Sequence, residues 1–389
     1  MYMSLFEKVP LAPPDPILGL THAFLQDKRK GKVNLGVGLY KDEQLKTPIL
    51  QAVKKAEAQL LQTEKSKEYL PIDGDGVYLE ETGALVFGKT LWSQERKRIA
   101  PFQTLGGTGA LKVGATFLQE ELKGPVWLPT PTWPNHRGVF TSAHLKVEAY
   151  PYYDSSRFDF EKMGSFLQKL PPKSIVLLHA CCHNPTGCDP TEEEWKKLGA
   201  LFCKYQLIPF FDLAYQGLGE GLEEDAAPLR HFLTSGLEML VAVSHSKNLS
   251  LYAERVGVLF VVSASEAIKT AVVSRIKQLI RTNYSNPPLH GAKVAALVLG
   301  DKNLRKLWEE ELFTMKNRLV EMRTLLAKRL SHPSFQQGKG MFGFLGLSPS
   351  QVARLMTEYG IYMPSDGRIN VCGLNANNVD YVVDAINHV

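Results

Sequence analysis

One stretch decides the fold of this chain, and it reads Leu237-Glu238-Met239-Leu240-Val241-Ala242-Val243-Ser244-His245-Ser246-Lys247-Asn248. Its first seven residues are mostly apolar, which is typical of a short strand buried on both faces of a sheet. Polar residues follow at once. Four further runs of this kind, separated by amphipathic stretches, are Gly124–Leu128, Ser174–Leu178, Leu207–Phe211 and Val256–Val262. This alternation predicts an α/β fold.

Polar or unusual side chains follow several of these runs. They are Trp133 and His136, then His183-Asn184-Pro185, then Asp212 and Tyr215, and finally Ser244 and Lys247. In open α/β sheets, ligands bind beyond the carboxyl ends of the strands. We therefore expect these side chains to meet in one pocket.

Length and composition limit the class of protein. A chain of 389 residues, 44% hydrophobic and 22% charged, is long enough for two lobes of an ordinary globular protein. The net charge of +5 comes with no dense basic stripe, so we expect no nucleic acid partner. The five cysteines are an odd, clustered set, which makes a poor disulfide framework and suggests a reducing compartment. With no signal peptide and no membrane-spanning apolar run, we expect a soluble, cytoplasmic protein.

The outer parts of the chain differ from the middle. Residues 1–14 are rich in proline and predict an extended arm. Asn303–His332 predicts a long charged helix, and 340–371 predicts a smaller strand–helix–strand unit. The polar boundary Gly300-Asp301-Lys302 is a candidate hinge.

A glycine-rich segment, Gly106-Gly107-Thr108-Gly109, precedes the predicted helix that starts at Ala110. Glycines let the backbone approach a ligand, and the first N–H groups of a helix are free to bind a phosphate. A plain tight turn is the alternative. The segment is neither a dinucleotide fingerprint nor a Walker loop.

Lys247 stands directly after a predicted buried strand. Such a lysine can extend to solvent or pair with an acid, or it can be a nucleophile with a lowered pKa that forms a Schiff base. Arg255 is equally open: it can pair with Glu254 on the surface or hold a phosphate.

Asp212 ends an apolar run, so its carboxylate needs a cationic partner. That partner is either a protein arginine or lysine, or the protonated ring nitrogen of pyridoxal phosphate (PLP), which a carboxylate keeps protonated. Tyr215 is placed to reach the phenolic oxygen of such a ring. Trp133, between two prolines, is either a stacking surface or an ordinary core residue.

The segment His179-Ala180-Cys181-Cys182-His183 has the residue types of a zinc site. We expect it to continue a strand, in which neighbouring side chains point to opposite faces and do not converge. The sequence therefore predicts no metal.

With these residues in view, the chain resembles the class I PLP-dependent aminotransferases, in particular the aspartate and aromatic amino acid aminotransferase group. The resemblance extends over nearly the whole chain, from Asp15 to Val371. Its motifs are Asn34-Leu35-Gly36-Val37-Gly38-Leu39-Tyr40-Lys41-Asp42-Glu43, Cys181–Gly187, Leu222–Asp225, Ser244-x-x-Lys247, Glu254–Gly257 and Asn283–Pro288.

The resemblance implies a role for each matching residue. Lys247 would bind PLP covalently and move the substrate proton, while Asp212, supported by His136, would pair with the ring nitrogen. Trp133 would stack on the ring, Asn184 and Tyr215 would hold its phenolic oxygen, and the phosphate would be held by Gly107, Thr108, Ser244 and Arg255, with Tyr69 of a second subunit. The substrate would be contacted by Gly38, Trp133, Asn184 and Arg368, with Arg368 on its α-carboxylate, and Arg281 of the second subunit would bind a side-chain carboxylate. These shared sites imply a homodimer.

The fold implied is PLP-dependent transferase fold type I, with a mostly parallel seven-stranded sheet in a large domain and a smaller α/β domain. Residues 1–14 would form the arm, 15–45 and 303–389 the small domain, and 46–302 the large PLP-binding domain.

The implied reaction is ping-pong transfer of an amino group from aspartate, and also from tyrosine or phenylalanine, to 2-oxoglutarate. A bulky Leu39 at the substrate mouth favours aromatic substrates, so a predominantly aromatic enzyme is the alternative. Two other hypotheses are weaker. An acyl-serine enzyme built on Ser244-x-x-Lys247 would need Ser-Asp-Asn and Lys-Thr-Gly tripeptides, which are absent from the sequence. A non-catalytic scaffold would need to have lost the lysine, aspartate or arginines.

Overall fold

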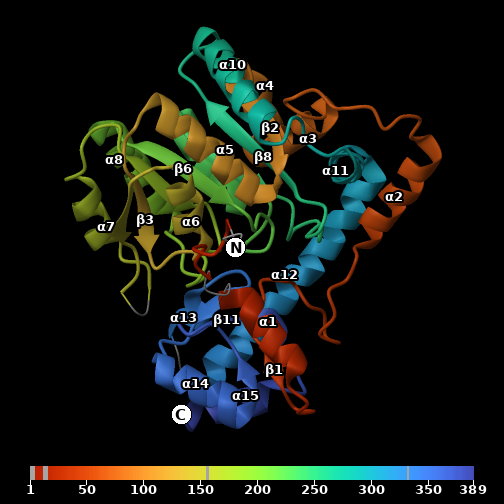
Figure 1. Ribbon diagram of the computed structural model, residues 1–389, viewed down its shortest axis with the longest axis vertical. Coiled ribbons are helices and arrows are strands. Elements are labelled where there is room, and N and C mark those ends of the chain that lie inside the picture. Colours follow the sequence, from red (N-terminus) through yellow and green to blue (C-terminus); the bar gives the residue numbers. More distant parts are fainter. Residues whose placement is uncertain (1–4, 12–15, 155–156, 331–332) are drawn as a thin grey trace.

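A seven-stranded sheet forms the centre of the larger lobe (Figure 1). The computed structural model describes residues 5–11, 16–154, 157–330 and 333–389. The strands are β2 (Ile99–Leu105), β3 (Val126–Thr130), β4 (Val147–Pro151), β5 (Ile175–His179), β6 (Ile208–Leu213), β7 (Met239–Ser244) and β8 (Val256–Val262). Their order is β2-β8-β7-β6-β5-β3-β4, and only the pairings of β8 with β2 and β7 are antiparallel. The predicted mostly parallel α/β sheet is confirmed.

Each of the five predicted apolar runs overlaps a strand, whereas β2 and β4 were not predicted. β2 carries Pro101, Gln103 and Thr104, so its polar residues conceal a strand that is largely buried. β4 is one of the two edge strands and has only one buried residue, Tyr150. An edge strand lacks the continuous apolar run of an interior one.

Helices cover both faces of the sheet, because successive strand residues point to opposite sides. Leu240 and Ala242 join one core cluster with α5 (Gly106–Glu121), α6 (Asn135–Ser142) and α10 (Glu266–Asn283). Met239, Val241 and Val243 face the other cluster. That face is covered by α3 (Gly76–Phe87), α8 (Glu192–Tyr205), α9 (Ala227–Thr234) and α11 (His290–Gly300). α7 (Phe160–Leu167) packs against β4 at the edge of the sheet, and α2 (Gln51–Thr63) and α4 (Lys89–Glu95) lie further out.

The smaller lobe is built from segments near both ends of the chain, drawn in red and in blue in Figure 1. Its elements are α1 (Pro16–Gln26), β1 (Val33–Asn34), α13 (Pro333–Gln337), β9 (Phe342–Phe344), α14 (Pro349–Tyr359), β10 (Ile361–Tyr362), β11 (Arg368–Asn370) and α15 (Val379–Asn387). β1 pairs in parallel with β10 through Val33 and Ile361. β9 pairs with β11, so both predicted strands of 340–371 form, with α14 between them.

The long helix α12 (Lys302–Leu330) passes through both lobes. It contacts α2 and α11 in the larger lobe and α13 and α15 in the smaller one. The predicted helix Asn303–His332 matches it, although His332 lies outside the described residues. Of the predicted extended arm, residues 1–4 and 12–14 also lie outside the description. Within the rest, a turn closes with a hydrogen bond from Val9 N to Phe6 O of 3.0 Å, so residues 5–9 are not extended.

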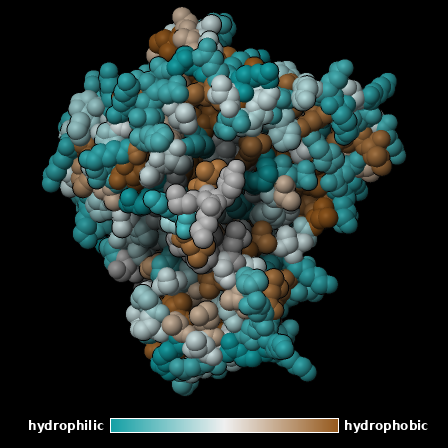
Figure 2. Space-filling view, in the orientation of Figure 1, coloured by the Kyte–Doolittle hydropathy of each residue, from teal (hydrophilic) through white to brown (hydrophobic). Residues whose placement is uncertain are grey.

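The surface is mostly hydrophilic, with scattered hydrophobic residues and a narrowing between the lobes (Figure 2). Within the described ranges, no helix is both long and apolar enough to cross a membrane.

Candidate active site

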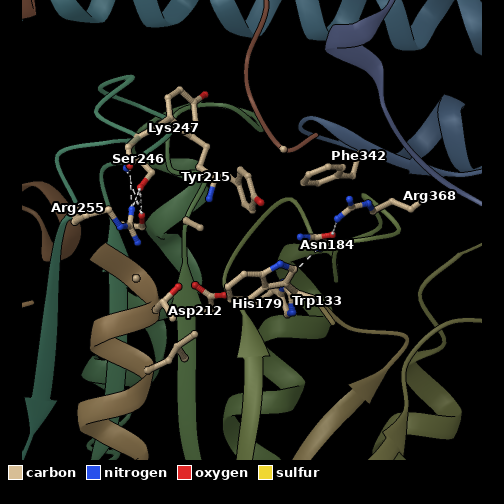
Figure 3. Close-up of a pocket in the computed structure, with 17 residues that line it drawn as sticks. Trp133, His179, Asn184, Asp212, Tyr215, Ser246, Lys247, Arg255, Phe342 and Arg368 are labelled. Atoms are coloured by element: carbon tan, nitrogen blue, oxygen red, sulfur yellow. Dashed lines mark hydrogen bonds between the residues drawn. The ribbon is translucent and has the colours of Figure 1, made fainter. Parts of the chain in front are cut away.

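A cavity of about 250 Å³ lies at the carboxyl ends of the central strands, where residues of both lobes meet. Its lining residues are Gly38, Gly107, Thr108, Leu111, Trp133, His179, Asn184, Asp212, Ala214, Tyr215, Ser244, Ser246, Lys247, Tyr252, Arg255, Phe342 and Arg368. Figure 3 shows Arg255 and Ser246 at one end, Arg368 and Asn184 at the other, and Lys247 and Asp212 between them. The predicted convergence of strand-end residues on one pocket is therefore observed.

Lys247 extends into this cavity from the loop after β7 (Figure 3). Its Nζ lies 5.1 Å from the centroid of the Tyr215 ring. Burial, and secondarily the charge of Arg255, lower the pKa of Lys247, although Asp212 opposes the shift. Within the described part of the chain, Lys247 forms no salt bridge. Of the alternatives left open by the sequence, this geometry favours a nucleophilic amine over a surface lysine.

Asp212 lies one residue before the end of β6 and faces the same cavity. Its Oδ2 is 3.1 Å from Nε2 of His136, which is fully buried. Burial alone would raise the pKa of Asp212, but the hydrogen bond and charge of His136 outweigh it and leave this pKa lowered. The carboxylate is therefore anionic. Its protein partner is a histidine rather than the arginine or lysine considered from the sequence.

The buried histidine is itself held in place. Nδ1 of His136 is 2.8 Å from Thr132 Oγ1, which is also 3.3 Å from Nε2 of His179. Burial, with the charge of His136, lowers the pKa of His179 to about 3, so His179 is neutral. Asp212 thus stands at the end of an ordered polar chain that fixes its orientation.

The end of the cavity that includes the start of α5 has the chemistry of an anion site. The helix begins at Gly106, so Gly107 and Thr108 lie in its first turn and not in a preceding loop as predicted. Leu105 at the N-cap gives no side-chain hydrogen bond to the first turn, so those N–H groups stay available to a ligand. A Cβ on Gly107 would lie 3.0 Å from Cβ of Ser244, so a larger residue would crowd this end.

Arg255 borders the same end of the cavity. Its Nη1 donates to Ser246 Oγ at 3.2 Å and its Nη2 to the Leu105 carbonyl at 3.4 Å. Among the described residues it forms no ion pair with Glu254, the surface alternative. A guanidinium beside a helix N-terminus suits a dianionic phosphate.

At the opposite end, Arg368 is buried on β11 with 2% of its surface exposed. Nη1 donates to Asn184 Oδ1 at 3.3 Å and Nη2 to the Gly36 carbonyl at 2.7 Å, while Nε has no partner. The Phe342 ring centroid is 4.5 Å from Cζ of Arg368. No carboxylate forms a salt bridge with this buried cation within the described ranges, so the site favours an anionic ligand.

Six lining residues were not among the predicted site residues: Leu111, His179, Ala214, Ser246, Tyr252 and Phe342. From the sequence, His179 was considered only as a possible zinc ligand, and Phe342 only as part of a predicted strand. The Tyr252 hydroxyl accepts a 2.8 Å hydrogen bond from Tyr40 N, which ties the Gly38–Tyr40 segment to the Lys247 loop. No local motif distinguishes such a contact in advance.

Three predicted site residues do not line the cavity within this chain: His136, which is buried against Asp212, Tyr69 and Arg281. Tyr69 is 92% exposed, and Arg281 is exposed on α10 with a hydrogen bond to Ser285. Leu39 is half-buried and is not among the lining residues. The predicted roles of Tyr69 and Arg281 depend on a second subunit and stay predictions.

The prediction that residues 179–183 continue a strand is wrong. β5 ends at His179, and Cys182 has a positive φ of 51°, so the chain turns instead of continuing the strand. The sulfur atoms of Cys181 and Cys182 gather with a carboxylate oxygen of Asp225 within 4.8 Å of one another.

Comparison with known proteins agrees with the site. A profile described as "Aminotransferase class I and II" matches residues 30–386. The aspartate aminotransferase of Haemophilus influenzae is 45% identical over 98% of this chain and 99% of its own. The structure of aromatic-amino-acid aminotransferase from Burkholderia pseudomallei, covalently bound to pyridoxal phosphate, has a TM-score of 0.96 at 44% identity and covers 99% of both chains.

A more distant relative is also similar along the whole fold. The cytoplasmic aspartate aminotransferase of Saccharomyces cerevisiae has a TM-score of 0.94 at 34% identity, covering 99% of this chain and 98% of its own. These matches give no support to an acyl-serine enzyme, and Ser244 Oγ donates a hydrogen bond to Ser246 Oγ at 3.1 Å. From its sequence and its fold, the chain belongs to the class I and II aminotransferases, a PLP-dependent family of enzymes.

Proposed function

We propose that this enzyme transfers the amino group of aspartate, and also of tyrosine or phenylalanine, to 2-oxoglutarate by a ping-pong mechanism. The observation that supports it best is one cavity with a phosphate end at α5 and Arg255, a nucleophilic Lys247 in the middle, and a buried, acid-free Arg368 at the far end. Aspartate and aromatic aminotransferases both occur among the similar proteins. A predominantly aromatic specificity is the second candidate.

The residues of the cavity fit PLP. When bound, this cofactor supplies an electron sink for the carbanion formed at the substrate Cα. Gly107, Thr108, Ser244 and Arg255 would hold its phosphate, and Trp133 would stack on its ring. Asp212, kept anionic by His136, would hold a proton on the ring nitrogen.

Lys247 and its neighbours would handle the remaining protons. When the substrate amine has taken the place of Lys247 on the cofactor, the free Lys247 amine would accept the Cα proton. Its lowered pKa keeps a neutral fraction available as the base. Burial raises the pKa of Tyr215, so its hydroxyl stays a hydrogen-bond donor beside Lys247. Tyr215 and Asn184 would hold the phenolic oxygen of the cofactor.

Substrate would lie between Lys247 and Arg368. The guanidinium of Arg368, backed by Asn184 and Gly36, would take the α-carboxylate bidentately. Gly38 leaves room at this point, since a Cβ there would lie 3.3 Å from the Phe342 ring. The side-chain carboxylate of aspartate would meet Arg281 of a second subunit.

The proposed assembly is a cytoplasmic homodimer with shared sites. Tyr69 and Arg281 are exposed in this chain and would complete the phosphate and substrate ends of the partner's cavity. We further propose 1–14 as an arm, 15–45 with 303–389 as a small domain, and 46–302 as the PLP domain. The pairing of β1 with β10 supports a small domain made from both chain ends.

Spectroscopy and kinetics test the reaction. Purified protein should show the visible absorption of bound PLP, which should shift when aspartate is added. Comparing kcat/KM for aspartate, tyrosine and phenylalanine, each with 2-oxoglutarate, ranks the two candidate functions. Protein that PLP cannot colour would contradict both.

Mixing two inactive variants tests the shared site. Lys247→Ala lacks the amine, and Arg281→Leu lacks the distal cation. In a mixed dimer, one site combines an intact Lys247 with an intact Arg281, so aspartate turnover should recover toward half the wild-type value. Recovery is expected only if Arg281 serves the neighbouring subunit; no recovery after verified subunit exchange would contradict the proposal.

A further inference from the structure

The loop after β5 borders two cavities. His179 and Asn184 line the active site, whereas Ala180 and Cys181 line a second cavity of about 340 Å³. The second cavity also includes the start of α8, the segment around Asp225, and Lys339 of the smaller lobe. None of the proposed catalytic steps uses it.

Two thiols and a carboxylate converge at this cavity. The Sγ atoms of Cys181 and Cys182 and a carboxylate oxygen of Asp225 all lie within 4.8 Å of one another. The three residues are 5%, 2% and 4% exposed. Cys181 and Asp225 line the cavity, so a small ion can reach them.

The backbone is fitted closely around this cluster. A Cβ added to Gly219 would lie 2.5 Å from Asp225 Oδ1 and 3.0 Å from Cys182 Sγ, so carboxylate and thiol flank the same point of the chain. On the other side, a Cβ added to Gly340 would lie 2.7 Å from Cys182 Sγ. Glycine at both positions lets thiol and carboxylate approach each other in a confined space.

The acidic residues that line this cavity outnumber its lysines. Its two lysines are already paired, Lys196 with Glu192 at 2.7 Å and Lys339 with Glu220 at 2.8 Å. In the part of the chain that the structure describes, Asp225 accepts hydrogen bonds from backbone N–H groups alone, those of Gly217, Gly219 and Glu220 at 2.8 to 2.9 Å.

A second buried carboxylate is in the same position. Asp189 accepts N–H bonds from Cys182 and His183 at 2.7 and 2.8 Å. Within the described ranges neither Asp189 nor Asp225 forms a salt bridge. Buried carboxylates are usually paired with a cation or bound to a metal, so a bound cation would offset their charge.

The geometry points to a binding site for one thiophilic divalent cation of the Zn²⁺ class, with Cys181, Cys182 and Asp225 as its ligands. Zn²⁺ takes sulfur at about 2.3 Å and carboxylate oxygen at about 2.0–2.2 Å, so inward movements of about an ångström close the observed cluster around the ion. Three protein ligands leave a fourth position, which would face the cavity and hold water. Mg²⁺ and Ca²⁺ prefer all-oxygen sites and would bind poorly here.

The backbone of one loop connects the proposed metal site to the active-site cavity. Cys182 precedes Asn184 by two residues, and Asn184 accepts the hydrogen bond from Arg368. An ion held by both thiols would fix the backbone that positions Asn184. The site is nevertheless independent of the proposed reaction, because its occupancy is measured without turnover.

Cadmium titration tests the site. The PLP-loaded protein is first stripped of metal with a chelator, in a Cys203→Ser background that removes the one exposed thiol among the five cysteines. Cd²⁺ is then added while the ultraviolet thiolate-to-cadmium absorption is followed and bound metal is counted by equilibrium dialysis. We expect one Cd²⁺ per chain, displaced by Zn²⁺ but not by Mg²⁺.

Matched serine variants locate the ligands. Cys181→Ser and Cys182→Ser should each weaken binding at least about tenfold and reduce the absorption. Cys188→Ser, a buried cysteine of the same loop, should leave both within about twofold. Substoichiometric binding, or equal losses in all three variants, would overturn the proposal. If one ligand variant fails to retain the PLP absorption of the folded protein, the other ligand variant and Asp225→Asn still decide the result.

Discussion

Replacing Arg368 with lysine should slow the turnover of every amino acid substrate by a similar factor. In the structure, Nη1 and Nη2 each donate one hydrogen to the protein, and Nε has no partner. Three of the five N–H groups therefore remain for a substrate carboxylate, enough for a bidentate pair. Lysine keeps the charge but makes only one such bond.

A hydrogen bond to a charged group contributes about 1.5–3 kcal/mol. Losing one should lower kcat/KM by about 10- to 150-fold. The assay compares kcat/KM for aspartate and for phenylalanine with 2-oxoglutarate. Because both substrates present the same α-carboxylate, the two factors should agree within about threefold. A loss confined to aspartate, or a loss below threefold for both, would refute the assignment of Arg368.

Arg318→Lys is the matched control. Arg318 is also a largely buried arginine, and its Nη2 donates to the carbonyls of Asp42 and Leu374 outside the cavity. Any general cost of changing a buried arginine should appear in its thermal unfolding, while kcat/KM stays within about threefold of wild type. PLP absorption of both variants checks that the cofactor site is intact.

Three further changes separate the remaining roles. Arg281→Leu should reduce kcat/KM for aspartate by about 10² or more, the cost of stranding one partner of a buried pair, and leave phenylalanine within about threefold. Asp212→Asn should lower kcat by about 10²–10³ with both substrates, because the anionic partner of the ring nitrogen is lost, while PLP absorption persists. His245→Gln should make the protein more resistant to mild acid. Burial lowers the pKa of His245 to about 4, so the neutral side chain contributes stability above pH 6.5 that is lost as pH falls toward 4. That loss is about 2 kcal/mol between pH 7 and pH 5, and thermal unfolding at the two pH values should show it in wild type and not in the variant.

Each of these outcomes has an opposite that contradicts the reasoning. Equal losses for aspartate and phenylalanine in Arg281→Leu would remove that residue from the side-chain carboxylate. Unchanged turnover in Asp212→Asn would mean that its carboxylate does not control the ring nitrogen. An acid sensitivity of His245→Gln equal to that of wild type would show that another group dominates the pH response.

The sequence predicted most of the sheet and of the cavity, because both depend on local pattern. The run before Lys247 is apolar over the length of one strand, and the polar residues after it could only lie at the strand's carboxyl end. The interior strands β5, β6 and β7 were found in the same way. β4 escaped because an edge strand with exposed side chains lacks that pattern.

The unpredicted parts depend on where the chain turns or on contacts distant in sequence. The helix α5 begins at Gly106, four residues before the predicted start at Ala110, so the glycine-rich segment is part of the helix. The resemblance implied His136 as the support of Asp212, but the strand pattern alone did not, because the contact requires two strand-end loops to meet. The proposed roles of Tyr69 and Arg281 need a second subunit, which the structure of a single chain does not contain.

The pairing of Val33 with Ile361 also constrains the order in which the two lobes can fold during synthesis. While the ribosome is still synthesising the middle of the chain, the first strand has no neighbour to bond with. The central sheet can form during that time, since all its strands lie between Ile99 and Val262. The lobe that holds Arg368 is completed only near the end of translation, so a truncated chain would retain the PLP-side core and lack the substrate clamp.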